Sequence, residues 1–203
     1  MHLKNNSGRY FSLYMIFIVG VSAGAFTVNG LSTLQNEELS NYLQGFFEIV
    51  EKQRFNSNEL LMISFQENIK AVALLWVLGV TIIGIPFIYL LVLVKGFIIG
   101  FSSGFIIKAM GGKGILFTFL TILPKEIILI PSIIALSVNG VNFSLNMIKS
   151  KSIKQILNQN LRMEIVRYTL FTLFFSVFVF FSSVIETYII PVFIRIITPM
   201  MVA

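Results

Sequence analysis

The sequence predicts an all-α fold: a polytopic membrane bundle of about five transmembrane helices, one of them broken by proline, with an external amphipathic helix. Hydrophobic residues make up 56% of the chain and charged residues 12%, against about 25% charged residues in soluble domains. Several apolar runs reach the roughly 20 residues that a bilayer crossing needs. One long polar stretch interrupts them at residues 31–68. We therefore expect the 203 residues to form a single membrane domain.

The composition argues against catalysis. The chain has no Cys, which excludes a disulfide framework, a thiolate nucleophile and a cysteine metal site. Its one His is His2, and its nine carboxylates are all Glu. We find no phosphate-binding loop, dinucleotide glycine fingerprint or zinc-protease motif. We expect a protein that is not an enzyme and that has no catalytic, cofactor or metal site.

The first predicted span covers residues 11–28. Gly20 and Gly24 stand four residues apart in it, at the spacing that lets a second helix approach closely. A cleaved signal peptide is the alternative, because the start is basic and Ala23-Gly24-Ala25 fits a cleavage site. The apolar run continues to Val28, which favours a retained membrane anchor.

The polar stretch contains an external amphipathic segment at residues 31–60. Its apolar residues recur at helical spacing, its glutamates lie off that stripe, and Ser32 or Ser40 is a candidate N-cap. The stripe consists of the candidate partner-binding residues Leu39, Leu43, Phe46, Phe47 and Val50, together with Tyr42. Two interpretations stay open: a helix that lies back on the bundle, or a docking surface for a partner.

The second and third predicted spans cover residues 68–85 and 86–110. Together they give about 40 apolar residues, twice what one crossing needs. Gly84 and Pro86 predict a tight hairpin between them. Lys95 is an intramembrane polar residue about a third of the way along the third span. We expect its side chain to extend toward the hairpin end if the helix is tilted.

A glycine ridge runs along the third span. Gly96, Gly100 and Gly104 repeat every four residues, which makes a smooth surface for close backbone packing. With Gly20 and Gly24 they are the predicted helix-packing residues. A permeation path along the ridge is the alternative interpretation.

The fourth predicted span, residues 115–138, is broken. Pro124 and Pro131 bracket Lys125 and Glu126, which are intramembrane polar residues where hydrocarbon would be expected. Ionisable residues at membrane depth usually face the bundle interior and find a partner. The two are about 100° apart on a helix, so they need not pair with each other. A helix end at the membrane interface is the alternative interpretation.

A bend at Asn139-Gly140 is expected next, followed by a basic cytoplasmic loop at residues 149–167 and a phenylalanine-rich last span at residues 168–190. Basic residues accumulate on the cytoplasmic side of membranes. The charge pattern therefore favours a cytoplasmic N terminus, an external acidic segment and an external C terminus. We attribute the net charge of +6 to contact of cytoplasmic loops with anionic lipid rather than to nucleic-acid binding.

The chain resembles the stage II sporulation protein M family over nearly its whole length. The central motifs are LWVLG at residues 75–79, GIP at 84–86 and LVKGFIIGF at 93–101. The pairs LP at 123–124 and ILIP at 128–131, and the first span from Ser12 to Gly24, fit as well. Distant relatives carry a Pro-His-Gly-x-x-Glu pattern in the fourth span. Here Pro124 is kept, but the His and the later Glu are missing.

The resemblance implies a multi-pass protein of endospore-forming bacteria, in the mother-cell septal and engulfing membrane. It implies a non-enzymatic scaffold that recruits stage II sporulation proteins P and D, the hydrolases that degrade septal peptidoglycan. A permease or transporter subunit that uses the broken fourth span is the alternative. Whether the chain forms a homo-oligomer stays open.

Overall fold

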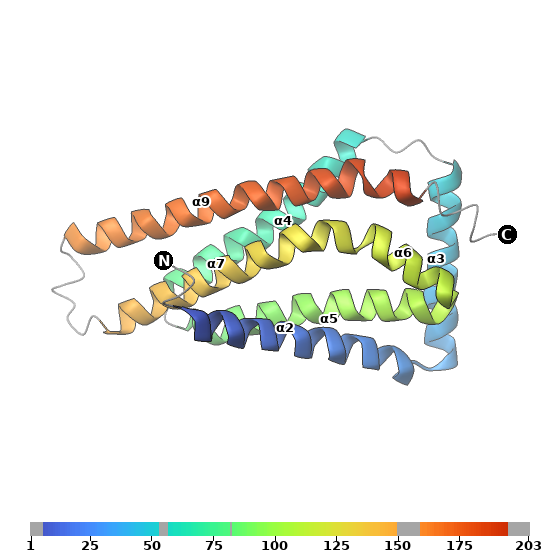
Figure 1. Ribbon diagram of the computed structural model, residues 1–203, viewed down its shortest axis with the longest axis horizontal. Coiled ribbons are helices and arrows are strands. Elements are labelled where there is room, and N and C mark those ends of the chain that lie inside the picture. The colour runs from blue at the N-terminus through green and yellow to red at the C-terminus, as the bar shows by residue number, and fades with distance from the viewer. Residues whose placement is uncertain (1–5, 53–56, 82, 150–158, 195–203) are drawn as a thin grey trace.

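The computed structural model describes residues 6–52, 57–81, 83–149 and 159–194, and every regular element in these ranges is a helix (Figure 1). The elements in chain order are α2 (Ser7–Thr27), the 3₁₀ turn η1 (Val28–Gly30), α3 (Thr33–Lys52), α4 (Ser57–Val80), α5 (Gly84–Met110), α6 (Gly112–Thr121), α7 (Leu123–Lys149) and α9 (Gln159–Tyr188).

Five stretches are long and apolar enough to cross a membrane: Ser7–Gly30, Asn58–Val80, Gly84–Met110, Leu123–Ile148 and Arg162–Ile194. The all-α fold and the five spans predicted from the sequence are confirmed. These helices lie roughly along the long axis of the molecule, whereas α3 crosses one end of the bundle (Figure 1).

The break in the fourth span falls at Ile122, between α6 and α7. Pro124 lies in the first turn of α7, where its missing N–H costs nothing. Pro131 lies inside α7 without ending it. The bend predicted at Asn139 and Gly140 is wrong, because α7 continues through both residues to Lys149. The stretch of this helix that is long and apolar enough to cross a membrane is Leu123–Ile148.

Helix α7 is the centre of the bundle. It packs against α2, α4, α5, α6 and α9, and it is the most buried of the five spans. One side of α7 carries Ile133 and Leu136 into a core shared with α4, α5 and α9. Its other side carries Ile134 and Val138 into a second core, where Leu13 of α2 is fully buried.

Helices α2 and α5 run side by side at very short range (Figure 1). Gly20 and Gly24 of α2 are both buried against the backbone of α5. A Cβ atom on Gly24 would lie 2.7 Å from the backbone N of Phe101, and one on Gly20 would lie 3.1 Å from that of Phe97. Any larger residue at these positions would therefore push the two helices apart.

The glycine ridge of α5 forms the other half of this contact. A Cβ atom on Gly100 would lie 2.8 Å from Val21 Cα, and one on Gly96 would lie 3.2 Å from the backbone N of the same residue. Gly104 is less confined: a Cβ atom there would lie 3.2 Å from Ala25 Cα. The five predicted helix-packing glycines thus lie along one helix pair within this chain.

A second close crossing joins α4, α7 and α9. A Cβ atom on Gly79 would lie 2.8 Å from Gly140 Cα, so α4 and α7 almost touch there. The Tyr168 hydroxyl of α9 lies 3.2 Å from the Leu75 carbonyl oxygen and 3.1 Å from that of Trp76, and donates to them. Gly140 is therefore a packing residue, which explains why its glycine does not bend α7.

The bundle has two different ends (Figure 1). The start of α2, the end of α4, the start of α5, the end of α7 and the start of α9 lie at one end, together with Arg9, Arg162 and Arg167; we call this the arginine end. The opposite end holds α3, the turn between α5 and α6, and the end of α9; we call this the α3 end. Lys108 lies there, and its ammonium group donates a hydrogen bond to the Val28 carbonyl oxygen at 2.8 Å.

Candidate functional site

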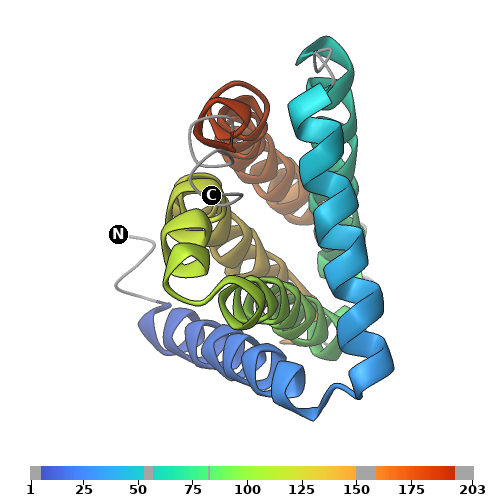
Figure 2. The same ribbon diagram turned by 90° about the vertical axis from the view of Figure 1, so that its right-hand side faces the viewer.

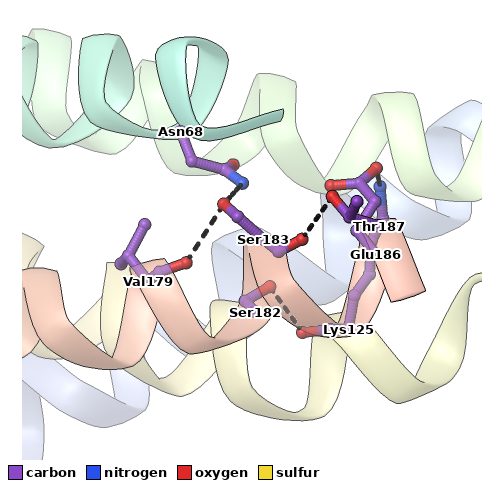
Figure 3. Close-up of polar contacts among 7 residues, drawn as sticks. All are labelled: Asn68, Lys125, Val179, Ser182, Ser183, Glu186 and Thr187. Atoms are coloured by element: carbon purple, nitrogen blue, oxygen red, sulfur yellow. Dashed lines mark hydrogen bonds and ion pairs between the residues drawn. The ribbon is translucent and has the colours of Figure 1, made fainter. Parts of the chain in front are cut away.

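Lys125 and Glu186 form an ion pair between α7 and α9 (Figure 3). Their side chains are 24% and 28% exposed, so the pair is largely withdrawn from the surface. One turn before Glu186, the Ser182 hydroxyl donates to the Lys125 carbonyl oxygen at 3.1 Å. Two polar contacts thus join the start of α7 to the last turns of α9.

Glu126, the neighbour of Lys125, faces a different part of the bundle. It is 6% exposed and lines a cavity of about 10 Å³ together with Lys95 of α5. Apolar side chains of α2, α5 and α7 line the rest of the cavity. The sequence predicted that the Lys95 side chain extends toward the hairpin at residues 84–86. In the structure it faces the interior near Glu126.

A polar contact between α4 and α9 lies close to the ion pair (Figure 3). The buried Asn68 amide donates to the Ser183 hydroxyl at 3.0 Å. Ser183 in turn donates to the Val179 carbonyl oxygen at 3.3 Å, and its own carbonyl accepts from Thr187 at 2.9 Å. Sequence reasoning missed this contact, because serine and threonine are common in apolar spans and carry no distinctive spacing here.

These interior charges balance. Two lysines, Lys95 and Lys125, and two glutamates, Glu126 and Glu186, sum to zero. Each lysine lies with a glutamate of another helix: Lys95 on α5 with Glu126 on α7, and Lys125 on α7 with Glu186 on α9. A cavity of about 10 Å³ has room for at most one water molecule. A charged side chain inside a bilayer is costly, and a nearby opposite charge in the bundle interior lowers that cost. The arrangement is therefore suited to holding the helices together.

Other chemical motifs can be placed as well. The residues from Gly100 to Gly104 spell the GxSxG pattern of hydrolases, but they lie inside α5 rather than on the strand-to-helix turn that exposes a nucleophile. In the part of the chain that the structure describes, no group of three His, Cys, Asp or Glu residues is placed to hold a metal ion.

The predicted amphipathic helix forms α3, and its start is capped as expected. Ser32 accepts from the Gln35 N–H at 3.3 Å, and the Gln35 side chain accepts from the Ser32 N–H at 3.0 Å, a reciprocal capping box. Seen from the α3 end, α3 runs along one edge of the bundle from the end of α2 to the start of α4 (Figure 2). The ends of α6 and α9 are left uncovered (Figure 2).

The apolar stripe of α3 is only partly in contact with the bundle. Leu39 and Leu43 are half-buried, whereas Tyr42 is 77% exposed. Leu34, one turn before the stripe, is 71% exposed. The backbone of α3 includes Phe46, Phe47 and Val50, but their side chains lie outside the described residues. Residues 150–158 of the predicted basic loop lie outside them too, while Arg162 and Arg167 lie on α9.

Comparison with known proteins gives one match. The family model for stage II sporulation protein M matches residues 13–191, which include all five spans in whole or in large part. No curated protein and no solved structure matches the chain. Because the family model covers most of the 203 residues, the chain belongs to the stage II sporulation protein M family of multi-span membrane proteins, and this membership implies a role in sporulation.

Proposed function

We propose that this chain is a non-enzymatic membrane scaffold in endospore formation. It recruits peptidoglycan-degrading partners to the septal membrane, so that the septal wall is thinned and the mother-cell membrane engulfs the forespore. By family resemblance, the partners are stage II sporulation proteins P and D. The observation that carries the proposal is the packing at the centre of the bundle: Lys125 and Glu186 form an ion pair between α7 and α9, and Lys95 and Glu126 line a cavity of only about 10 Å³.

A permease or transporter subunit is the competing function. Such a protein needs a water-filled route at the bilayer midplane, lined by the polar residues that select the solute. Lys95 and Glu126 line a cavity that holds at most one water molecule. Lys125 forms an ion pair with Glu186 of α9. These observations support a scaffold rather than a protein that conducts a solute across the membrane.

We place the α3 end outside the cytoplasm. The arginine end then lies on the cytoplasmic side, as the preference for basic residues there requires. Helix α3, with Glu37 and Glu38 exposed, faces the compartment that contains peptidoglycan. A scaffold for wall hydrolases needs its docking surface on that side, and among the described residues α3 is the long helix at this end that crosses the bundle instead of spanning it (Figure 2).

We further propose that α3 is the docking surface. The exposed Tyr42 and Leu34 offer apolar anchors that are not used within the described part of the chain. Aromatic anchors tend to dominate interface energies, and the neighbouring glutamates would steer a basic partner toward them. Phe46 and Phe47 continue the same stripe along the helix.

Docking of a partner's transmembrane segment on the glycine ridge is a weaker alternative. Gly20, Gly24, Gly96 and Gly100 are already in contact with each other's helix, so the ridge is not free for a second protein. A partner helix inside the membrane would instead meet exposed apolar faces such as that of α2, where Phe26 is 75% exposed.

Co-purification tests the scaffold proposal. The full chain in mild detergent is expected to retain the peptidoglycan hydrolases at matched expression. Solute uptake into proteoliposomes provides the second arm. Absence of capture, combined with uptake that Glu126→Gln abolishes, would contradict the scaffold and favour the permease. Capture without uptake is the result that we expect.

A further inference from the structure

The arginine end contains a polar pocket of about 520 Å³ that the scaffold role does not use. It lies between the start of α2, the last turns of α7 and the first half of α9. Its polar lining consists of Arg9, Asn139, Asn142, Asn146, Glu164 and Arg167, with Asn6 beside Arg9. The volume falls in the range of about 300 to 1,000 Å³ that is typical of small-molecule sites.

Three asparagines form one wall of the pocket. Asn139, Asn142 and Asn146 follow the i, i+3, i+7 spacing that places residues on one face of a helix. The Asn139 amide donates to the Tyr168 carbonyl oxygen at 3.4 Å. The Asn142 side-chain oxygen is buried and accepts no hydrogen bond within the described residues.

Two arginines provide the positive charge. Arg9 uses one of its five N–H groups to donate to the Asn6 side-chain oxygen at 3.0 Å. Arg167 is exposed, and within the described residues it has no ion-pair partner, since the one ion pair there joins Lys125 and Glu186. With Glu164 as the one lining carboxylate, two positive charges and one negative charge leave a net charge of +1.

The arginines lie near the outer ends of their helices, where a spanning helix meets lipid headgroups. Arg9 is two residues from the start of the first candidate span and Arg167 five residues from the start of the last. Phe143, Tyr168 and Phe171 line the apolar part of the pocket, next to the polar groups.

We propose that this pocket binds a glycerophosphate group. The phosphate would lie between Arg9 and Arg167, because a guanidinium group matches phosphate geometry with two parallel hydrogen bonds. The hydroxyl groups of the glycerol would donate to the Glu164 carboxylate. Basic pockets between transmembrane helices on the cytoplasmic side bind anionic lipid headgroups in the same way. The ligand is either a membrane lipid such as phosphatidylglycerol or a soluble glycerophosphate.

This inference does not depend on the scaffold function. The pocket lies at the opposite end of the bundle from α3, and its lining residues do not contribute to the proposed docking surface (Figure 1). Loss of lipid binding would leave hydrolase capture through α3 unaffected, so the two proposals can fail separately.

Titration of the purified full chain in detergent tests the pocket. Phosphatidylglycerol, phosphatidylcholine and soluble glycerol phosphate are added separately, and binding is followed by native mass spectrometry and by the midpoint of thermal unfolding. Phosphatidylglycerol is expected to bind the wild type about tenfold more tightly than phosphatidylcholine. If soluble glycerol phosphate competes, the headgroup suffices; if it does not, the ligand is the intact lipid.

Charge-removing variants locate the site. Arg167→Gln, at an exposed position that should not disturb folding, is expected to weaken phosphatidylglycerol binding about fivefold, and Arg9→Gln with Arg167→Gln about tenfold or more. Arg162→Gln is the matched control, because Arg162 lies on the same helix but does not line the pocket. Equal binding by the wild type and Arg167→Gln would overturn the proposal. An equal loss in Arg162→Gln would also overturn it, since general surface charge would then explain the binding.

Discussion

Lys125, in the first turn of α7, is ion-paired with Glu186, near the end of α9. The pair joins the central helix of the bundle to the last span, across 61 positions of sequence. Since α6 ends before Ile122 and α7 begins at Leu123, this contact and the Ser182 hydrogen bond hold the start of α7 against α9 at the break between the two helices.

The ion pair is expected to stabilise the bundle. Removal of one partner leaves the other charge uncompensated, which costs about 3 to 5 kcal/mol for a fully buried pair. Since the two side chains are 24% and 28% exposed, we expect Glu186→Gln to lower the free energy of unfolding by about 1 to 3 kcal/mol. Unfolding in a denaturing detergent measures this.

A double-mutant cycle isolates the pair. Lys125→Met combined with Glu186→Leu removes both charges and is expected to cost less than the sum of the two single changes. Strict additivity of the two free energies would show that the ion pair does not couple α7 to α9.

The contact between α2 and α5 is expected to tolerate no side chain at Gly100. A Cβ there would lie 2.8 Å from Val21 Cα, so Gly100→Ala should separate the helices and destabilise the protein by about 1 to 3 kcal/mol. Gly100→Leu should abolish the folded state. Gly8→Ala on α2 is the matched control, because nothing lies within 4 Å of its Cβ position. An unfolding free energy for Gly100→Ala no lower than that of the control would disprove the close contact.

Labelling of single cysteines tests the orientation of the protein in the membrane. The chain has no native Cys, so single-cysteine variants report one position each. With the α3 end outside, Asn41→Cys on α3 should react with an impermeant thiol reagent in intact cells. Thr81→Cys, exposed at the arginine end, and Asn158→Cys should be protected until the membrane is permeabilised. Protection of Asn41→Cys would invert the orientation and remove α3 from the compartment of the hydrolases.

Much of the fold follows from local sequence. The lengths of the apolar runs predicted five spans, since hydrophobic thickness sets helix length directly. The i, i+4 glycines predicted close packing, and Ser32, one of the two predicted N-cap candidates, caps the start of α3.

The remaining features depend on which helices meet. No local pattern indicates that Lys125 pairs with Glu186, or that Lys95 faces Glu126, because the partners come from different spans. A glycine such as Gly140 fits a bend and a close crossing equally well, and only the neighbouring Gly79 decides between them. The asparagine-lined pocket was missed for the same reason: α2, α7 and α9 each contribute only a part of it.

The central claim is that α3 captures the hydrolases, and the most direct measurement is their co-purification with variants of its exposed stripe. Tyr42→Glu introduces a charge at a side chain that is 77% exposed, so it should leave the bundle intact and reduce capture about tenfold or more, as hot-spot aromatics do. Phe46→Glu with Phe47→Glu should have the same effect. Gln44→Glu adds the same charge at an exposed position off the stripe and should capture normally. Undiminished capture by both Tyr42→Glu and the double variant, at matched membrane levels, would contradict docking on α3.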